Sequence, residues 1–159
     1  MNFYDSKQLL ALCEKEKMSI ADVMIQREIA LFHTDEATIL ARMAHAYDIM
    51  KNAANRALKE KLVSMGGLIG GESQKIYAHA TEASVCGPMM SKAISYAVGV
   101  LEVNCSMGLI VAAPTAGSSG VIPGVFIALQ EQFKLSDEQM IKGLFTAGAV
   151  GYMITRNAT

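Results

Sequence analysis

Five glycine or hydroxyl-bearing residues lie between two prolines in the stretch VAAPTAGSSGVIPG, which starts at residue 111. They are Thr115, Gly117, Ser118, Ser119 and Gly120. A helix that follows such a stretch exposes unpaired backbone N–H groups at its positive end. Hydroxyls add further donors there, and glycines let an anion come close to the backbone. The stretch therefore predicts a pocket that binds the carboxylate of a small substrate.

A second segment, ASVCGPMM, repeats this arrangement with Ser84, Gly87 and Pro88. The proline suits the first turn of a helix, where its missing N–H costs nothing. Both segments can also be read as ordinary helix boundaries, and spacing alone leaves the two readings about even.

Other kinds of site have less support. GSSG is followed by Val-Ile-Pro, so it is neither a phosphate-binding loop nor the GxGxxG of a dinucleotide fold. The sequence contains no HExxH and no GxSxG elbow. For Lys75, His79 and Lys92 a structural or solvated role is favoured over a catalytic one. Glu102 and Asn104 either orient a substrate or satisfy one another. No catalytic residue is assigned.

The elements that must position these residues are expected to be helices. Residues 1–65 contain no glycine or proline and carry most of the charge, as amphipathic helices do. Helices are expected to start at Asp5 or Ser6, at Ser19 with a capping box to Asp22, and at Thr34 in a segment that runs through LKEKLV.

Residues 66–159 hold all 13 glycines, and only Lys92 and Glu102 are charged between residues 83 and 130. Here we expect a buried helix with Pro88 in its first turn, a helix over GVFIALQEQF, and an apolar helix capped by Ser136 and Gln139. The fold class is all-α: one compact, bundle-like domain with N-terminal amphipathic helices (1–65) and a glycine-rich, buried second half (66–159).

Composition excludes several classes of protein. A net charge of −1 and the lack of a dense Lys/Arg run argue against nucleic acid as a partner. The N-terminus has no signal-peptide pattern, so a cytoplasmic location is expected. The three cysteines form neither a CxxC nor a Cys/His cluster, which predicts reduced thiols and no metal site. The uncharged region around residues 103–130 is interrupted by prolines and polar residues, so we expect no membrane span.

Taken together, the segments from ASVCGPMMSKAISYAVGVLEVNCSMG through APTAGSSGVIPG to FTAGAVGYMITRNAT closely resemble the α chain of bacterial iron-sulfur-dependent L-serine dehydratase, the two-subunit L-serine ammonia-lyase. The resemblance runs from the N-terminal helices to the last residue. It implies conversion of L-serine to pyruvate and ammonia by a largely helical α chain that works with a β chain. It also implies a 4Fe-4S cluster whose open iron acts as a Lewis acid on the substrate hydroxyl.

The sequence departs from the family's pattern in one respect. The cluster cysteines of the family are expected beyond an RNAT-like segment, and this sequence stops at Thr159. Cys13, Cys86 and Cys105 do not match those positions and are not assigned as ligands. We expect an N-terminal fragment of the α chain that by itself binds no cluster, is inactive, and self-associates through exposed apolar surface.

Two other classes of function remain compatible with the sequence. The first is a non-catalytic helical interaction module, which needs only apolar patterning and no glycine motifs. The second is a membrane-associated helical protein. The resemblance assigns Ser84, Gly87, Pro88, Thr115, Gly117, Ser118, Ser119 and Gly120 to the binding of serine's carboxylate or amine.

Overall fold

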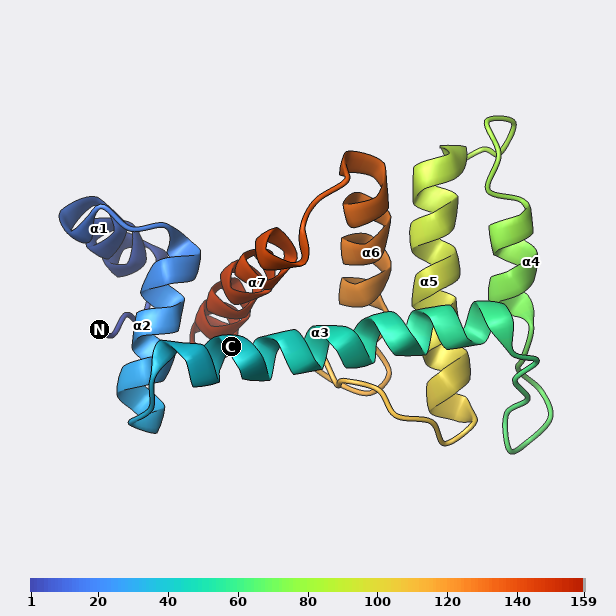
Figure 1. Cartoon of the computed structure of the whole chain (residues 1–159), viewed down its shortest axis with the longest axis horizontal. Coiled ribbons are helices and arrows are strands. Elements are labelled where there is room, and N and C mark those ends of the chain that lie inside the picture. Colours follow the sequence, from blue (N-terminus) through green and yellow to red (C-terminus); the bar gives the residue numbers. More distant parts are fainter. Residues whose placement is uncertain (159) are drawn as a thin grey trace. The chain divides into compact units, whose positions relative to one another are not determined.

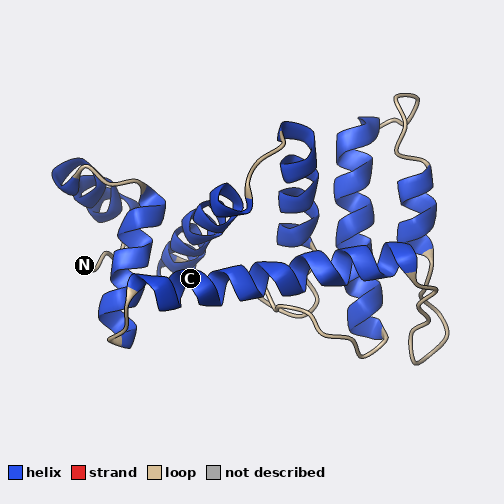
Figure 2. Cartoon of the chain, in the orientation of Figure 1, coloured by secondary structure: helices blue, strands red, loops and turns tan. Residues whose placement is uncertain are grey.

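The structure, a computed structural model, describes residues 1–158 and is helical throughout, with no strand in that range (Figures 1 and 2). Seven helices follow one another within these residues: α1 (Ser6–Glu16), α2 (Ile20–Phe32), α3 (Glu36–Lys59), α4 (Glu72–Ala78), α5 (Gly87–Cys105), α6 (Val121–Phe133) and α7 (Asp137–Asn157). The predicted all-α class is confirmed. The chain divides into two compact units, Met1–His45 with the segment from Ser136 on, and Ala46–Leu135.

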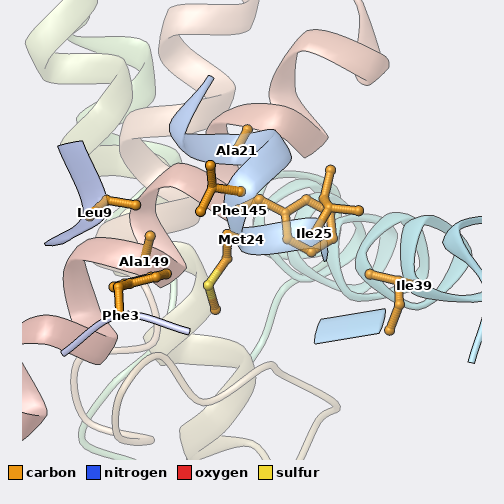
Figure 3. Packing of buried hydrophobic residues seen from close by; sticks show 9 residues of the cluster. Phe3, Leu9, Ala21, Met24, Ile25, Ile39, Phe145 and Ala149 are labelled. Atoms are coloured by element: carbon orange, nitrogen blue, oxygen red, sulfur yellow. The ribbon is translucent and has the colours of Figure 1, made fainter. Parts of the chain in front are cut away.

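The first unit holds α1, α2, the start of α3 and α7. Three of its helix starts are those that the sequence predicts: Asp5 caps α1, and capping boxes open α2 (Ser19 with Asp22) and α7 (Ser136 with Gln139). Helix α3 begins at Glu36, two residues after the predicted Thr34. Its core is apolar (Figure 3). The buried members are Phe3, Leu9, Ala21, Val23, Met24, Ile25, Ile39, Phe145 and Ala149.

The second unit holds the rest of α3 with α4, α5 and α6, and it carries every residue of the predicted site. Its core uses small residues of α3 against larger ones of α5 and α6. Ala57 of α3 lies very close to Gly99 of α5: a Cβ added to Gly99 would be 2.9 Å from the Cβ of Ala57. The core residues are Ala53, Ala54, Ala57, Leu62, Tyr96, Val100, Val103 and Ile127.

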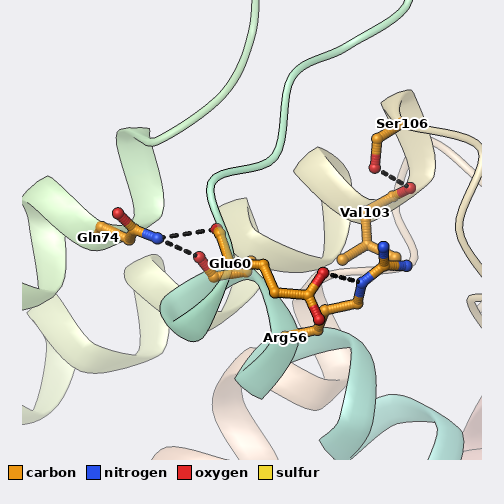
Figure 4. A network of polar contacts seen from close by, with 6 residues as sticks. Arg56, Glu60, Gln74, Val103 and Ser106 are labelled. Carbon is orange, nitrogen blue, oxygen red and sulfur yellow. Dashed lines mark hydrogen bonds and ion pairs between the residues drawn. The ribbon is translucent and has the colours of Figure 1, made fainter.

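Two helix boundaries differ from the sequence-based expectation. The third helix ends at Lys59 rather than continuing to Val63. The Gln74 amide of α4 donates to the Ala57 carbonyl in the last turn of α3 and to the Glu60 carbonyl just after it (Figure 4). Helix α6 begins at Val121, earlier than expected, because Pro123 is accepted in a first turn. Helix α4 itself was not predicted.

Candidate functional site

The Thr115–Gly120 loop precedes α6, and its hydroxyls bind one another. The Thr115 Oγ1 and Ser118 Oγ atoms are 3.0 Å apart. Each of these oxygens also accepts the other residue's backbone N–H, both at 3.3 Å, and the Ser118 hydroxyl contacts the Ala113 carbonyl at 3.2 Å. Thr115 is exposed and Ser118 half-buried. The loop thus presents a preformed pair of hydroxyls to its surroundings.

Two residues of this loop are packed inside the unit. Ser119 is fully buried, and its hydroxyl donates to the Ala116 carbonyl at 2.7 Å. A Cβ on Gly120 would overlap the Ala97 carbonyl of α5, and one on Gly124 would come within 2.6 Å of the Ala93 carbonyl. These glycines let α6 pack closely against α5, so their local role is helix packing.

Gly117 has a different environment. A Cβ there would meet only the loop's own Thr115 Oγ1, at 3.9 Å. Its exposed backbone therefore has room for a ligand. Helix α6 has no side-chain cap and directs its positive end at the loop, although the Val121 N–H already donates to the Ser118 carbonyl at 3.1 Å and Pro123 has no N–H.

The Ser84–Pro88 segment opens α5, with Pro88 in the first turn as predicted. Gly87 has a φ of +71°, a left-handed conformation that favours glycine. Ser84 Oγ lies 3.0 Å from Ser91 Oγ, one helical turn into α5. The segment is thus both a helix boundary and a site of paired hydroxyls.

Helix α5 separates the two segments. Gly120 faces Ala97, which is ten residues beyond Gly87, or about 15 Å along the helix at 1.5 Å per residue. Ser91 lies on the α4 side of α5, since Ser95, one turn on, bonds to Ser73 of α4. Positions two apart on a helix point in roughly opposite directions, so the faces of Ser95 and Ala97 differ. The structure does not bring the two segments into one pocket.

A concavity of about 340 Å³ lies between α4, the turn after it and the start of α5, and we call it the α4–α5 cavity. Of the predicted residues, Ser84 lines it. It also contains side chains that the sequence could not place there, because α4 was not foreseen. The lining residues are Lys75, Ile76, His79, Ser84, Val85, Cys86, Ser91 and Ile94.

Glu102 and Asn104 bond to different partners rather than to each other. The Glu102 carboxylate is buried and accepts the Ser73 N–H (2.9 Å) and hydroxyl (2.6 Å). The Asn104 amide reaches the Ala116 carbonyl of the Thr115–Gly120 loop at 3.5 Å. A hydrogen bond with Glu102 is one of the causes that lower the pKa of Glu72, after the backbone N–H groups of Glu72 and Gly70.

A second charged network crosses from α5 to α6. The Lys92 ammonium donates to Glu131 at 3.0 Å, and the Tyr96 hydroxyl donates to the other oxygen of that carboxylate. The bond to Glu131 raises the pKa of Lys92, and burial followed by Glu131 raises the pKa of Tyr96. These groups satisfy one another, which agrees with the structural role favoured for Lys92.

The described residues do not fit a metal cluster. Within residues 1–158 no three His, Cys, Asp or Glu side chains gather to hold a metal. Cys13 and Cys105 are half-buried at separate helices, and Cys86 is exposed before α5. Nor, in that range, is any helix both long and apolar enough to cross a bilayer.

Comparison with known proteins identifies the family of this chain. The model of the serine dehydratase alpha chain family matches residues 15–159. The probable L-serine dehydratase alpha chain of Bacillus subtilis is 39% identical over 158 residues, which cover 99% of this chain and 52% of that protein. The alpha chain from Peptoniphilus asaccharolyticus is 32% identical, covering 97% of this chain and 53% of its own length.

A third relative, the L-serine dehydratase of Helicobacter pylori strain 26695, is 30% identical over 163 residues, which cover 99% of this chain and 36% of that protein. The chain thus spans about half the length of the alpha chains that it matches. Because the family model covers nearly the whole chain, the protein belongs to the serine dehydratase alpha chain family.

Proposed function

We propose that this chain forms the substrate-binding part of an enzyme that deaminates L-serine to pyruvate and ammonia. The observation that carries the proposal is the family match over residues 15–159. In the proposed reaction serine loses its α-proton and its hydroxyl as water, and the resulting enamine becomes an imine. One water molecule is taken up when that imine hydrolyses, which balances the one that was lost. Serine is thus converted to pyruvate and ammonia without an oxidant.

The carboxylate of serine is assigned to the Thr115–Gly120 loop. Three features support this: the exposed Thr115–Ser118 hydroxyl pair, the open backbone of Gly117, and the positive end of α6. Ser119 is buried with its hydroxyl bound to the Ala116 carbonyl of the loop, and Gly120 packs on Ala97 of α5, so the proposed contacts are those of Thr115, Gly117 and Ser118. The chain's contribution is to bind and orient the substrate.

The Ser84–Pro88 segment is too distant to contact the same serine molecule within this unit. The carboxylate and amine of serine are only a few ångströms apart, whereas the two segments are separated by about 15 Å along α5. Ser84, Gly87 and Pro88 therefore remain candidate ligand contacts that are separate from the proposed carboxylate site.

The remaining parts of the enzyme are proposals that rest on the resemblance. They are a 4Fe-4S cluster and a β chain. A cytoplasmic location is proposed from the N-terminal sequence, and self-association of this chain from its exposed apolar surface. The described side chains do not gather to fit such a cluster, so no reaction step is assigned to it here. The catalytic base is likewise unassigned.

Steady-state kinetics of the complete enzyme that contains this sequence test the proposal. Thr115→Ala and Ser118→Ala remove hydroxyls that would bind the carboxylate, so each is expected to raise KM for L-serine about tenfold, as the loss of a hydrogen bond to a charged group does. Ser106→Ala is the matched control, since that hydroxyl only donates to the Val103 carbonyl at 3.0 Å. Unchanged KM in both loop variants would exclude the loop as the carboxylate site. Absence of pyruvate formation by the wild-type enzyme would favour the non-catalytic interaction module.

A further inference from the structure

Apart from Ser84, no residue that lines the α4–α5 cavity has a part in the function proposed above. It lies on a different face of α5 from the one that contacts the Thr115–Gly120 loop, and is lined by residues from three consecutive parts of the chain: α4, the turn that follows it, and the first two turns of α5. Its volume of about 340 Å³ is at the lower end of the range for small-molecule pockets.

The polar groups around the cavity are mostly donors. Lys75 contributes an ammonium, and His79 a ring nitrogen from the end of α4. The Ser84–Ser91 pair has two hydroxyl protons, but the hydrogen bond between the two oxygens uses only one of them. The second proton is left for another acceptor, next to a Ser91 side chain that is only 8% exposed.

The cavity also has an apolar wall, made by Ile76 of α4, Val85 of the turn and Ile94 of α5. Val85 is fully exposed and Ile94 is 39% exposed, so both have apolar surface to bury. A lining that combines donors with aliphatic side chains fits a ligand with an anionic head and a short apolar chain.

The wall formed by α4 is held in place without a ligand. The Glu102 carboxylate binds the backbone and hydroxyl of Ser73, and the Ser95 hydroxyl donates to the Ser73 carbonyl at 2.7 Å. These buried bonds fix the N-terminal turn of α4 on α5, so the backbone that carries Lys75 and Ile76 is already in place. A preformed site loses less free energy to ordering when it binds.

We infer that the α4–α5 cavity is a second binding site, which takes a small carboxylate with a short aliphatic chain. It is separate from the Thr115–Gly120 loop, and the inference does not depend on the serine site. Lys75 and the Ser84–Ser91 pair bind the carboxylate, and Ile76 and Ile94 contact the chain.

The test is an NMR titration of the ¹⁵N-labelled chain with butyrate, in which the shifts of the backbone amide signals are measured. Butylammonium reverses the charge of this probe, and 1-butanol removes it. Butyrate is expected to give saturable shifts at Ser84, Cys86 and Ser91 with at least tenfold higher affinity than either control compound. Equal binding of 1-butanol, or no saturable shift, would overturn the inference.

Three variants complete the test. Lys75→Ala and Ser84→Ala are each expected to weaken butyrate binding at least threefold, while Lys61→Ala, which removes an exposed lysine outside the cavity, leaves it unchanged. Ser118→Ala is also expected to leave it unchanged, which separates this site from the proposed serine site. Unaltered affinity in both cavity variants would mean that the residues named here do not bind the carboxylate.

Discussion

Glu102 of α5 and Ser73 of α4 are joined by two buried hydrogen bonds, in which one carboxylate accepts both the backbone N–H and the hydroxyl of the serine. Among the described residues Glu102 has no ion-pair partner. Its partners instead lie in the first turn of α4, where backbone N–H groups lack partners within the helix. Helix α4 is seven residues long and its N-cap, Gly71, provides no side-chain bond, so Glu102 supplies the cap from another helix.

Glu102→Leu is expected to lower the free energy of unfolding by about 3 kcal/mol, because it leaves two buried donors of Ser73 without an acceptor. Urea denaturation measures this loss. Glu60→Gln is the control: its carboxylate forms an exposed pair with Arg56, and such pairs contribute less than about 1 kcal/mol. Equal stability of the Glu102→Leu and Glu60→Gln variants would contradict the role given to Glu102.

Asp22 gives a pH dependence with a defined sign. Hydrogen bonds from Ser19 are the main cause that lowers its pKa below 3.8. A carboxyl whose pKa is lowered by folding stabilises the native state above its unfolded pKa, and this contribution disappears as the pH falls through the folded value. The difference in melting temperature between wild type and Asp22→Ala should therefore be largest near pH 7 and become smaller below about pH 3.8. Melting temperatures measured across this range check the prediction, and a difference that grows on acidification would contradict it.

Tyr96 is expected to ionise well above the ordinary value of 10.0. Burial is the larger cause and the hydrogen bond to Glu131 the next. Stability from this group is complete below pH 10 and is lost as the pH rises through the folded pKa. Glu131→Gln should lower the pKa of Tyr96 only part of the way, because burial persists. Ultraviolet titration of wild type, Glu131→Gln and Tyr96→Phe measures this. Ionisation of Tyr96 together with the exposed tyrosines would contradict it.

Most helix starts could be predicted from the sequence because their signals are local. Ser19 with Asp22, and Ser136 with Gln139, are three residues apart, and each pair closes its capping box in the structure. Helix α4 could not be predicted in the same way. Its N-cap is a glycine and its stabilising carboxylate is 29 residues away in the sequence.

The candidate site was predictable only as separate segments. The sequence places Pro88 at the start of one helix and the Thr115–Gly120 loop before another, and the structure confirms both positions. Whether the segments meet depends on which face of α5 each one contacts, and that is set by tertiary packing. The same packing places Gly120 against the Ala97 carbonyl of α5, a contact that composition does not predict.

Gly117 and Gly120, three residues apart in one loop, should respond differently to alanine. At Gly120 the added methyl group would overlap the Ala97 carbonyl, so Gly120→Ala is expected to lower the free energy of unfolding by about 1–3 kcal/mol, as overpacking does. At Gly117 the methyl group meets only Thr115 Oγ1 at 3.9 Å, so stability should stay within about 0.5 kcal/mol. Because that methyl group would occupy the space assigned to serine's carboxylate, Gly117→Ala should nevertheless raise KM for L-serine in the complete enzyme. Urea denaturation and initial-rate kinetics separate the two effects. A Gly117→Ala enzyme with normal stability and normal KM would place the substrate elsewhere.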